Sequence, residues 1–101
     1  MAVTIECENT CVTAFIKGEI DHHISASIRN EIDRAIERNQ PKTLVLDFGG
    51  VSFMDSSGIG LVMGRYKKMN LIGGKVRVEN TPSHIKKVMK IAGLSSLAII
   101  E

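Results

Sequence analysis

Aromatic residues are scarce in this sequence, which has no tryptophan, one tyrosine and three phenylalanines. Long hydrophobic runs are also missing, and none approaches the roughly 20 residues that a membrane-spanning helix needs. The chain does not open with a basic segment followed by an apolar run, which is the pattern of a secretory signal. We therefore expect a cytoplasmic protein that does not enter membranes and has few aromatic rings on which nucleic-acid bases could stack.

Cysteine is scarce as well, since Cys7 and Cys11 are the two that the chain contains. Cys7 follows the apolar positions of an alternating stretch, so we expect it to be a small buried hydrophobic residue and not half of a disulfide. His22 and His23 could join the cysteines in a metal site, but the spacing of the four matches no standard zinc pattern. The sequence therefore predicts no metal centre.

The charge is uneven along the chain. Residues 1–49 carry 5 basic and 8 acidic side chains, a balance of −3, whereas residues 50–101 carry 8 and 3, a balance of +5. A basic half can indicate a nucleic-acid partner. Five lysines of this half, however, fall on the expected outer faces of helices: Lys67, Lys68, Lys86, Lys87 and Lys90. We therefore expect no direct contact with nucleic acid.

Apolar periodicity predicts one α/β domain over residues 1–101, with the element order β-β-α-β-α-β-α-β. The first two strands, on either side of Asn9 and Thr10, should form an antiparallel hairpin, and the inner strands, which helices separate, should pair in parallel. The expected strands cover residues 3–8, 11–17, 43–48 and 75–79, with a last strand or extended tail over 97–100 and a loop over 49–54. The expected helices cover residues 24–38, 57–72 and 82–92, and the first should bury Ile24, Ile28, Ile32, Ala35 and Ile36.

The junction after the third expected strand carries the polar residues Asp55, Ser56 and Ser57. Short polar side chains at such a place cap a helix by accepting hydrogen bonds from its free N–H groups. Glycines at 58, 60 and 64 follow, each costing roughly 1 kcal/mol relative to alanine inside a helix. We expect Gly64 to permit close packing on the sheet, while Gly58 and Gly60 keep the first turn bare for a partner or a phosphate.

Two catalytic or ligand-binding interpretations of this junction are possible. A nucleotide-binding domain would use Gly58, Gly60 and Gly64 with Glu79 as the ribose-binding acid, but the spacing is G-x-G-x-x-x-G and no P-loop is present. A hydrolase would use Ser56 or Ser57 with a histidine as base, yet the sequence has no G-x-S-x-G elbow. A third interpretation makes a serine the substrate, because a hydroxyl at a helix N-terminus can be phosphorylated without unfolding the helix.

Three segments together resemble a known family: MDSSGIG at 54–60, GRYKK at 64–68 and GEIDHHIS at 18–25. They are similar to the anti-sigma factor antagonists of the STAS-domain family, and most of all to its sporulation anti-sigma-F members. The resemblance runs from the first strand to about Ile100. Those relatives continue in a further C-terminal extension beyond the position of Glu101, whose role the resemblance leaves open.

The resemblance implies a STAS-like mixed sheet packed with helices, and a regulatory protein rather than an enzyme. The unmodified form is expected to bind an anti-sigma factor that is also a serine kinase, and thereby to release the sigma factor. Phosphorylation of Ser57 by that kinase, which binds the ATP, would switch the binding off, and a metal-dependent serine phosphatase would restore it. The expected partner-binding residues are Asp21, Asp55, Ser56, Gly58, Ile59 and Gly60, and this chain would need no cofactor of its own.

The order of residues at the junction adds one expectation, that Asp55 and Ser56 cap the helix while Ser57 presents its hydroxyl. The alternatives within the same family are a general-stress antagonist and a scaffold subunit of a signalling assembly. The alternative from another class remains the small nucleotide-binding domain.

Overall fold

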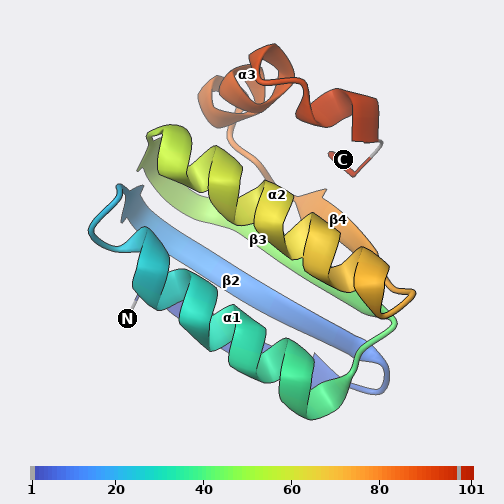
Figure 1. The fold of residues 1–101 in the computed structure, drawn as a ribbon. Coiled ribbons are helices and arrows are strands. Elements are labelled where there is room, and N and C mark those ends of the chain that lie inside the picture. The colour runs from blue at the N-terminus through green and yellow to red at the C-terminus, as the bar shows by residue number, and fades with distance from the viewer. Residues whose placement is uncertain (1, 98) are drawn as a thin grey trace.

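Four strands form one mixed sheet in the order β1-β2-β3-β4 in this computed structural model, which describes residues 2–97 and 99–101. β1 (Val3–Glu8) and β2 (Cys11–Ile20) are antiparallel, and β3 (Thr43–Met54) and β4 (Lys75–Glu79) add in parallel (Figure 1). The turn between β1 and β2 places Asn9 at φ 56°, a conformation that asparagine tolerates. The predicted antiparallel hairpin and parallel inner strands are confirmed.

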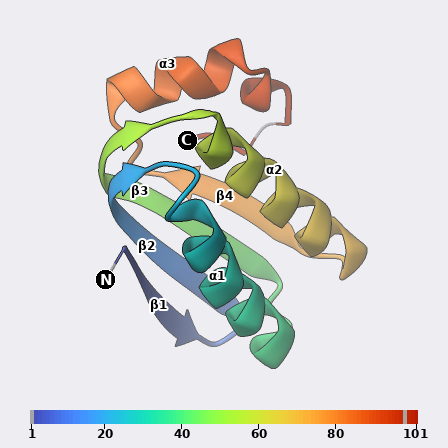
Figure 2. The same ribbon diagram turned by 60° about the vertical axis from the view of Figure 1, so that its left-hand side comes forward.

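Helices follow β2, β3 and β4 in turn: α1 (Ser25–Asn39), α2 (Ser56–Leu71) and α3 (Ser83–Ile91), the last continuing into the short 3₁₀ helix η1 (Leu94–Leu97). Figures 1 and 2 show α1 and α2 side by side on one face of the sheet, with α3 beyond α2. Within the described residues, no helix is long and apolar enough to cross a membrane.

The core lies between the sheet and the helices, and it follows from the two periodicities of the sequence. Alternate strand residues point inward, and α1 contributes one apolar residue per turn. Fully burying each of these side chains contributes about 1.5–3 kcal/mol relative to leaving it in water. The buried members from β2, β3 and α1 include Val12, Ala14, Ile16, Leu44, Leu46, Phe48, Ile28, Ile32 and Ile36.

The predicted loop over residues 49–54 is wrong, because β3 continues to Met54 and β2 correspondingly to Ile20. Two adjacent glycines suggested the break. Instead, Gly50 lies where the register between β2 and β3 shifts, and a Cβ there would lie 2.7 Å from Lys17 Cβ. Glycine inside a strand often marks such an irregularity or close backbone approach. Because β3 continues to Met54, the strand ends directly before Asp55 and the start of the next helix.

The last strand or extended tail expected over residues 97–100 is reduced to a single β-bridge. Leu97 belongs to η1, Ala98 is outside the described residues, and Ile100 forms a single parallel bridge with Val78 of β4. The expected burial of Cys7 is also wrong, since this residue is exposed near the end of β1, where Asn39 Nδ2 lies 3.4 Å from its sulfur. The alternation was right, but the core does not extend to this end of the strand.

The glycines of α2 have different roles from those expected. Gly58 is buried, and a Cβ at this position would lie 2.1 Å from Met54 Cγ, so its absence serves packing within the protein. A Cβ on Gly64, expected to pack closely, would meet no atom within 4 Å, and the same is true of Gly60. Gly60 is therefore bare, as expected, and its role toward a partner stays a prediction.

This difference generates a matched pair of predictions. Gly58→Ala should lower the free energy of unfolding by about 1–3 kcal/mol, because overpacking against Met54 outweighs the gain in helix propensity. Gly64→Ala should raise it by up to about 1 kcal/mol, because the new methyl group enters open space. Urea unfolding of both variants measures the two changes, and equal effects of the two substitutions would contradict the assignment.

Candidate functional site

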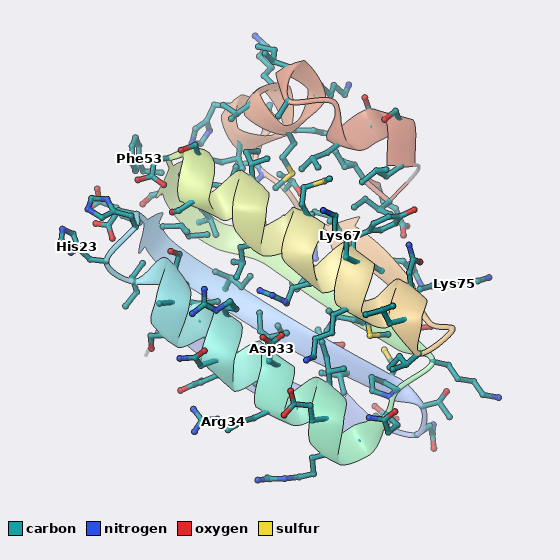
Figure 3. All side chains as sticks on the ribbon, viewed as in Figure 1. His23, Asp33, Arg34, Phe53, Lys67 and Lys75 are labelled. Carbon is teal, nitrogen blue, oxygen red and sulfur yellow. The ribbon has the colours of Figure 1, made fainter. Side chains whose placement is uncertain are left out.

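Two connections of the chain meet at one edge of the sheet. Because β2 and β3 are parallel, the segment after β2 and the segment after β3 both leave from their carboxyl ends. The Asp55 N–H donates to the Ile20 carbonyl oxygen at 3.0 Å, and His22 Nδ1 lies 3.9 Å from Asp55 Oδ2. Figure 3 shows Phe53 and His23 at this same edge. The predicted partner residues Asp21 and Asp55 are thereby brought onto neighbouring segments.

Asp55 is the N-cap of α2, as predicted. Its backbone is extended, with φ −93° and ψ −170°, and its side chain turns back over the first turn of the helix. Oδ1 accepts hydrogen bonds from the backbone N–H of Ser57 at 2.8 Å and from the Ser57 hydroxyl at 2.5 Å. The Asp55 carbonyl oxygen accepts a third bond, from the N–H of Gly58 at 3.0 Å. One residue therefore fixes both the start of α2 and the direction of the Ser57 hydroxyl.

The two serines differ in exposure and in hydrogen bonding. Ser56 is exposed, and its hydroxyl bonds to no other described residue, so the expectation that it shares the capping with Asp55 is wrong. Ser57 is half-buried, with its O–H donated to Asp55. The hydroxyl of Ser57 is held in one orientation rather than freely presented.

The same hydrogen bonds set the ionisation of the site. The bond from the Ser57 hydroxyl is the largest cause that lowers the pKa of Asp55 below its ordinary value of 3.8, followed by the bond from the Ser57 N–H. Burial, the next largest cause, acts in the opposite sense and raises this pKa, while a backbone hydrogen bond and the charge of His22 lower it by smaller amounts. A carboxylate with a lowered pKa is a poor base. Asp55 therefore orients the hydroxyl without activating it as a nucleophile.

Asp21 shapes the segment between β2 and α1. Its Oδ1 accepts the backbone N–H groups of His23 at 2.9 Å and Ile24 at 3.0 Å, and its carbonyl oxygen accepts from Ser25. The carboxylate thus orders the turn that carries the two histidines beside Asp55. A partner contact by Asp21 stays a prediction, and the structure adds this local role to it.

The remaining predicted residues lie at different depths. Gly60 is exposed, Ile59 is half-buried with its side chain packed against the core, and Gly58 is buried beneath Met54. The surface around Ser57 is therefore formed by Ser56, Gly60 and parts of Ile59. Gly58 contributes to this surface only through the course of its backbone.

The sequence reasoning passed over Phe53, which is 50% exposed at the end of β3. Strict alternation could not have found it, because Val51 and Met54 are both buried while Ser52 and Phe53 between them are both exposed. The register between β2 and β3 shifts at this point, which a sequence pattern does not reveal. An exposed aromatic ring beside a polar site is a common feature of protein interfaces.

The structure separates the residues that the other interpretations need. His84 Nε2 contacts the Ser52 carbonyl oxygen at 3.0 Å and His22 lies beside Asp55, so neither forms a nucleophile–base pair with a serine. Glu79 forms an ion pair with Arg77 at 2.7 Å on β4. Cys11 begins β2 and His22 follows its end, so the four metal candidates are not brought together.

The Asp55–Ser57 contact generates a prediction about pKa. Ser57→Ala removes the hydroxyl donor, so the pKa of Asp55 should rise toward 3.8, as measured by the ¹³C chemical shift of its carboxyl carbon against pH. With a lowered folded pKa, the stability that ionised Asp55 contributes is complete above its unfolded pKa and is lost as pH falls through the folded value. Part of that acid-sensitive stability should be missing in Ser57→Ala. Ser56→Ala is the control, and an Asp55 pKa equal in both variants would contradict the assignment.

Comparisons with known proteins agree with this fold. Residues 2–100 match the family model described as the STAS domain. The anti-sigma F factor antagonist of Paenibacillus polymyxa is 39% identical over 79 residues, which cover 78% of this chain and 68% of that protein.

Two solved structures are similar over almost the whole chain. The anti-sigma factor antagonist SpoIIAA in its unphosphorylated form is 33% identical, with a TM-score of 0.87 over 99% of this chain and 86% of that one. The Bacillus cell fate determinant SpoIIAA in its phosphorylated form is also 33% identical, with a TM-score of 0.79 over 99% and 89%. With a family model spanning residues 2–100 and relatives at this identity, the chain belongs to the STAS-domain family.

Proposed function

We propose that this chain is an anti-sigma factor antagonist whose binding to its partner is switched off by phosphorylation of Ser57. The names of the similar proteins support the class of function, and the two solved forms of SpoIIAA support a switch by phosphorylation. In the unmodified form, the chain binds the anti-sigma factor and the sigma factor is released. The phosphorylated form does not bind.

The observation that carries the proposal is the position of the Ser57 hydroxyl. It lies in the first turn of α2, half-buried, and is held by a carboxylate that is too weak a base to activate it. A phosphate there would add about −1.5 to −2 charges at the positive end of the helix dipole. The fold accommodates such a group, whereas a partner packed on the same surface would meet a new buried charge.

The partner in this proposal is an anti-sigma factor that is also the serine kinase. It supplies the ATP and the catalytic base, so this chain is a substrate and acts without a cofactor or metal ion. A metal-dependent serine phosphatase returns the chain to its binding form. The compartment is the cytoplasm, where sigma factors and ATP are found.

The proposed partner surface combines polar groups with one aromatic ring. Asp21, Ser56 and Gly60 provide polar and bare surface around Ser57, and Phe53 provides apolar area at its margin. Aromatic side chains that become fully buried on association contribute a large share of the binding free energy. We therefore expect Phe53 to be an anchor of the complex.

Phosphorylation of Ser57 is tested by incubation with the anti-sigma factor of the same organism and ATP, followed by mass spectrometry of the phosphopeptide. Wild type and Ser56→Ala should each take up one phosphate, and Ser57→Ala should take up none. Calorimetry should then show that the phosphorylated protein no longer binds the anti-sigma factor. Phosphate uptake by Ser57→Ala at the wild-type level would overturn the assignment.

The role of Phe53 is tested with two matched truncations. Phe53→Ala should weaken binding to the anti-sigma factor by about tenfold or more, because a buried aromatic anchor contributes over 1 kcal/mol. Leu71→Ala removes an even more exposed side chain, 88% accessible near the other end of α2, and should leave affinity unchanged. Calorimetry measures both, and equal affinities of the two variants would place the interface elsewhere.

A further inference from the structure

A hollow of about 280 Å³ lies between α1 and α2, next to the proposed phosphorylation site. Gly60 adds no side chain to it, and apart from the adjoining backbone of α2 no atom lies within 4 Å of where a Cβ of Gly60 would be. The residues that line it come from both helices: Ser25, Arg29, Ser57, Gly60, Leu61 and Arg65. Its walls therefore include the serine and two arginines.

Arg65 is the one charged residue that the structure records as buried among the described residues, with 7% of its surface exposed. Its Nε lies 2.9 Å from Asp33 Oδ1 in an ion pair without hydrogen-bond geometry, and both Nε and the buried Nη1 have no hydrogen-bond partner in the described part of the chain. Figure 3 shows Asp33 in the space between α1 and α2. A buried guanidinium N–H without a partner costs free energy, and an anion in the hollow would reduce that cost.

The charges around the hollow do not balance. Arg29 and Arg65 contribute two positive charges, and Asp33 supplies one negative charge to Arg65. Burial is the main cause that lowers the pKa of Arg65, and the repulsion from Arg29 adds to it. Asp55 is not among the lining residues, and its Oδ2 lies 3.9 Å from His22 Nδ1. One positive charge around the hollow is thus not neutralised by an acidic side chain, and a phosphate on Ser57 could reach it.

Phosphorylation changes which neighbour Ser57 can bind. When the γ-phosphoryl group of ATP moves to Ser57 Oγ, an O–P bond forms, the bond to ADP breaks and the hydroxyl proton leaves to the kinase. The Ser57 side chain then has no donor for Asp55 Oδ1, which keeps only the bond from the Ser57 backbone N–H, and two anions lie side by side. Rotation about the Ser57 side chain relieves this repulsion by turning the phosphate away from Asp55.

We propose that the phosphate on Ser57 turns into the hollow between α1 and α2 and is held there by Arg29 and Arg65 of the same chain. This inference rests on the proposed function for the identity of the modified residue. Arg29 is exposed, so its long side chain can turn toward the phosphate, while Arg65 is held by its ion pair with Asp33. The bidentate geometry of guanidinium suits phosphate oxygens.

The test uses protein with phosphoserine incorporated at position 57 during translation, so it does not depend on the kinase. The second pKa of the phosphate, ordinarily about 6, is measured by ³¹P NMR in wild type, Arg29→Gln and Arg34→Gln. Arg34 is a matched control, because it is exposed on α1 and Figure 3 shows it pointing away from α2. In Arg29→Gln the phosphate pKa should rise by about half a unit, and in Arg34→Gln it should equal wild type.

Equal phosphate pKa values in all three proteins would overturn the inference, whatever the kinase does. Conversely, failure of the kinase to modify Ser57 would overturn the proposed function and leave this measurement valid. Unmodified protein is also titrated with inorganic phosphate and followed through its amide resonances. We expect no saturable shift below about 10 mM, and tight binding of free phosphate would assign the hollow to a phosphate from another molecule.

Discussion

The candidate site depends on a single carboxylate oxygen, Asp55 Oδ1, which accepts hydrogen bonds from both the backbone N–H and the hydroxyl of Ser57. The first bond starts α2, and the second fixes the orientation of the hydroxyl. Because the Asp55 N–H is bonded to Ile20 at the end of β2, the same residue also ties the start of α2 to the sheet. A change at Ser57 therefore acts where hydrogen bonds join the start of α2, the end of β2 and the candidate site. It alters the exposed surface around Ser57.

Much of the fold could be predicted because it depends on local periodicity. The isoleucines of α1 recur at helical spacing and are buried as expected at Ile28, Ile32 and Ile36, and the hairpin follows from alternation around a turn. The failures arise where local composition and tertiary context disagree. Gly49 and Gly50 resemble a loop, yet Gly50 relieves a close approach to Lys17 that depends on strand pairing. The exposure of Cys7 depends on where the core ends, which the strand's own pattern does not contain.

The site could be predicted in part for the same reason. The capping role of Asp55 follows from its order before a helix, and the resemblance supplied Ser57 as the candidate phosphoacceptor. Nothing local, however, distinguishes Arg65 from the other basic residues of α2, although it is buried and paired with Asp33 on another helix. Likewise, the sequence alone does not distinguish Gly58 from Gly64, since both are glycines within the same helix. Only the position of Met54 in the fold decides which of them tolerates a methyl group.

The two proposals together describe a switch that exchanges the binding partner of one side chain. In the unmodified chain, the Ser57 hydroxyl is a donor and is held by a carboxylate; as a phosphate monoester it is an acceptor and requires cations. Asp55 accepts the bond from the Ser57 hydroxyl, and Arg29 and Arg65 line the hollow that Ser57 also lines. Each chemical state thus has a matching neighbour within the same fold. A small domain can then switch a partner on and off by changing charge and side-chain direction at its surface, without having to rearrange the sheet beneath.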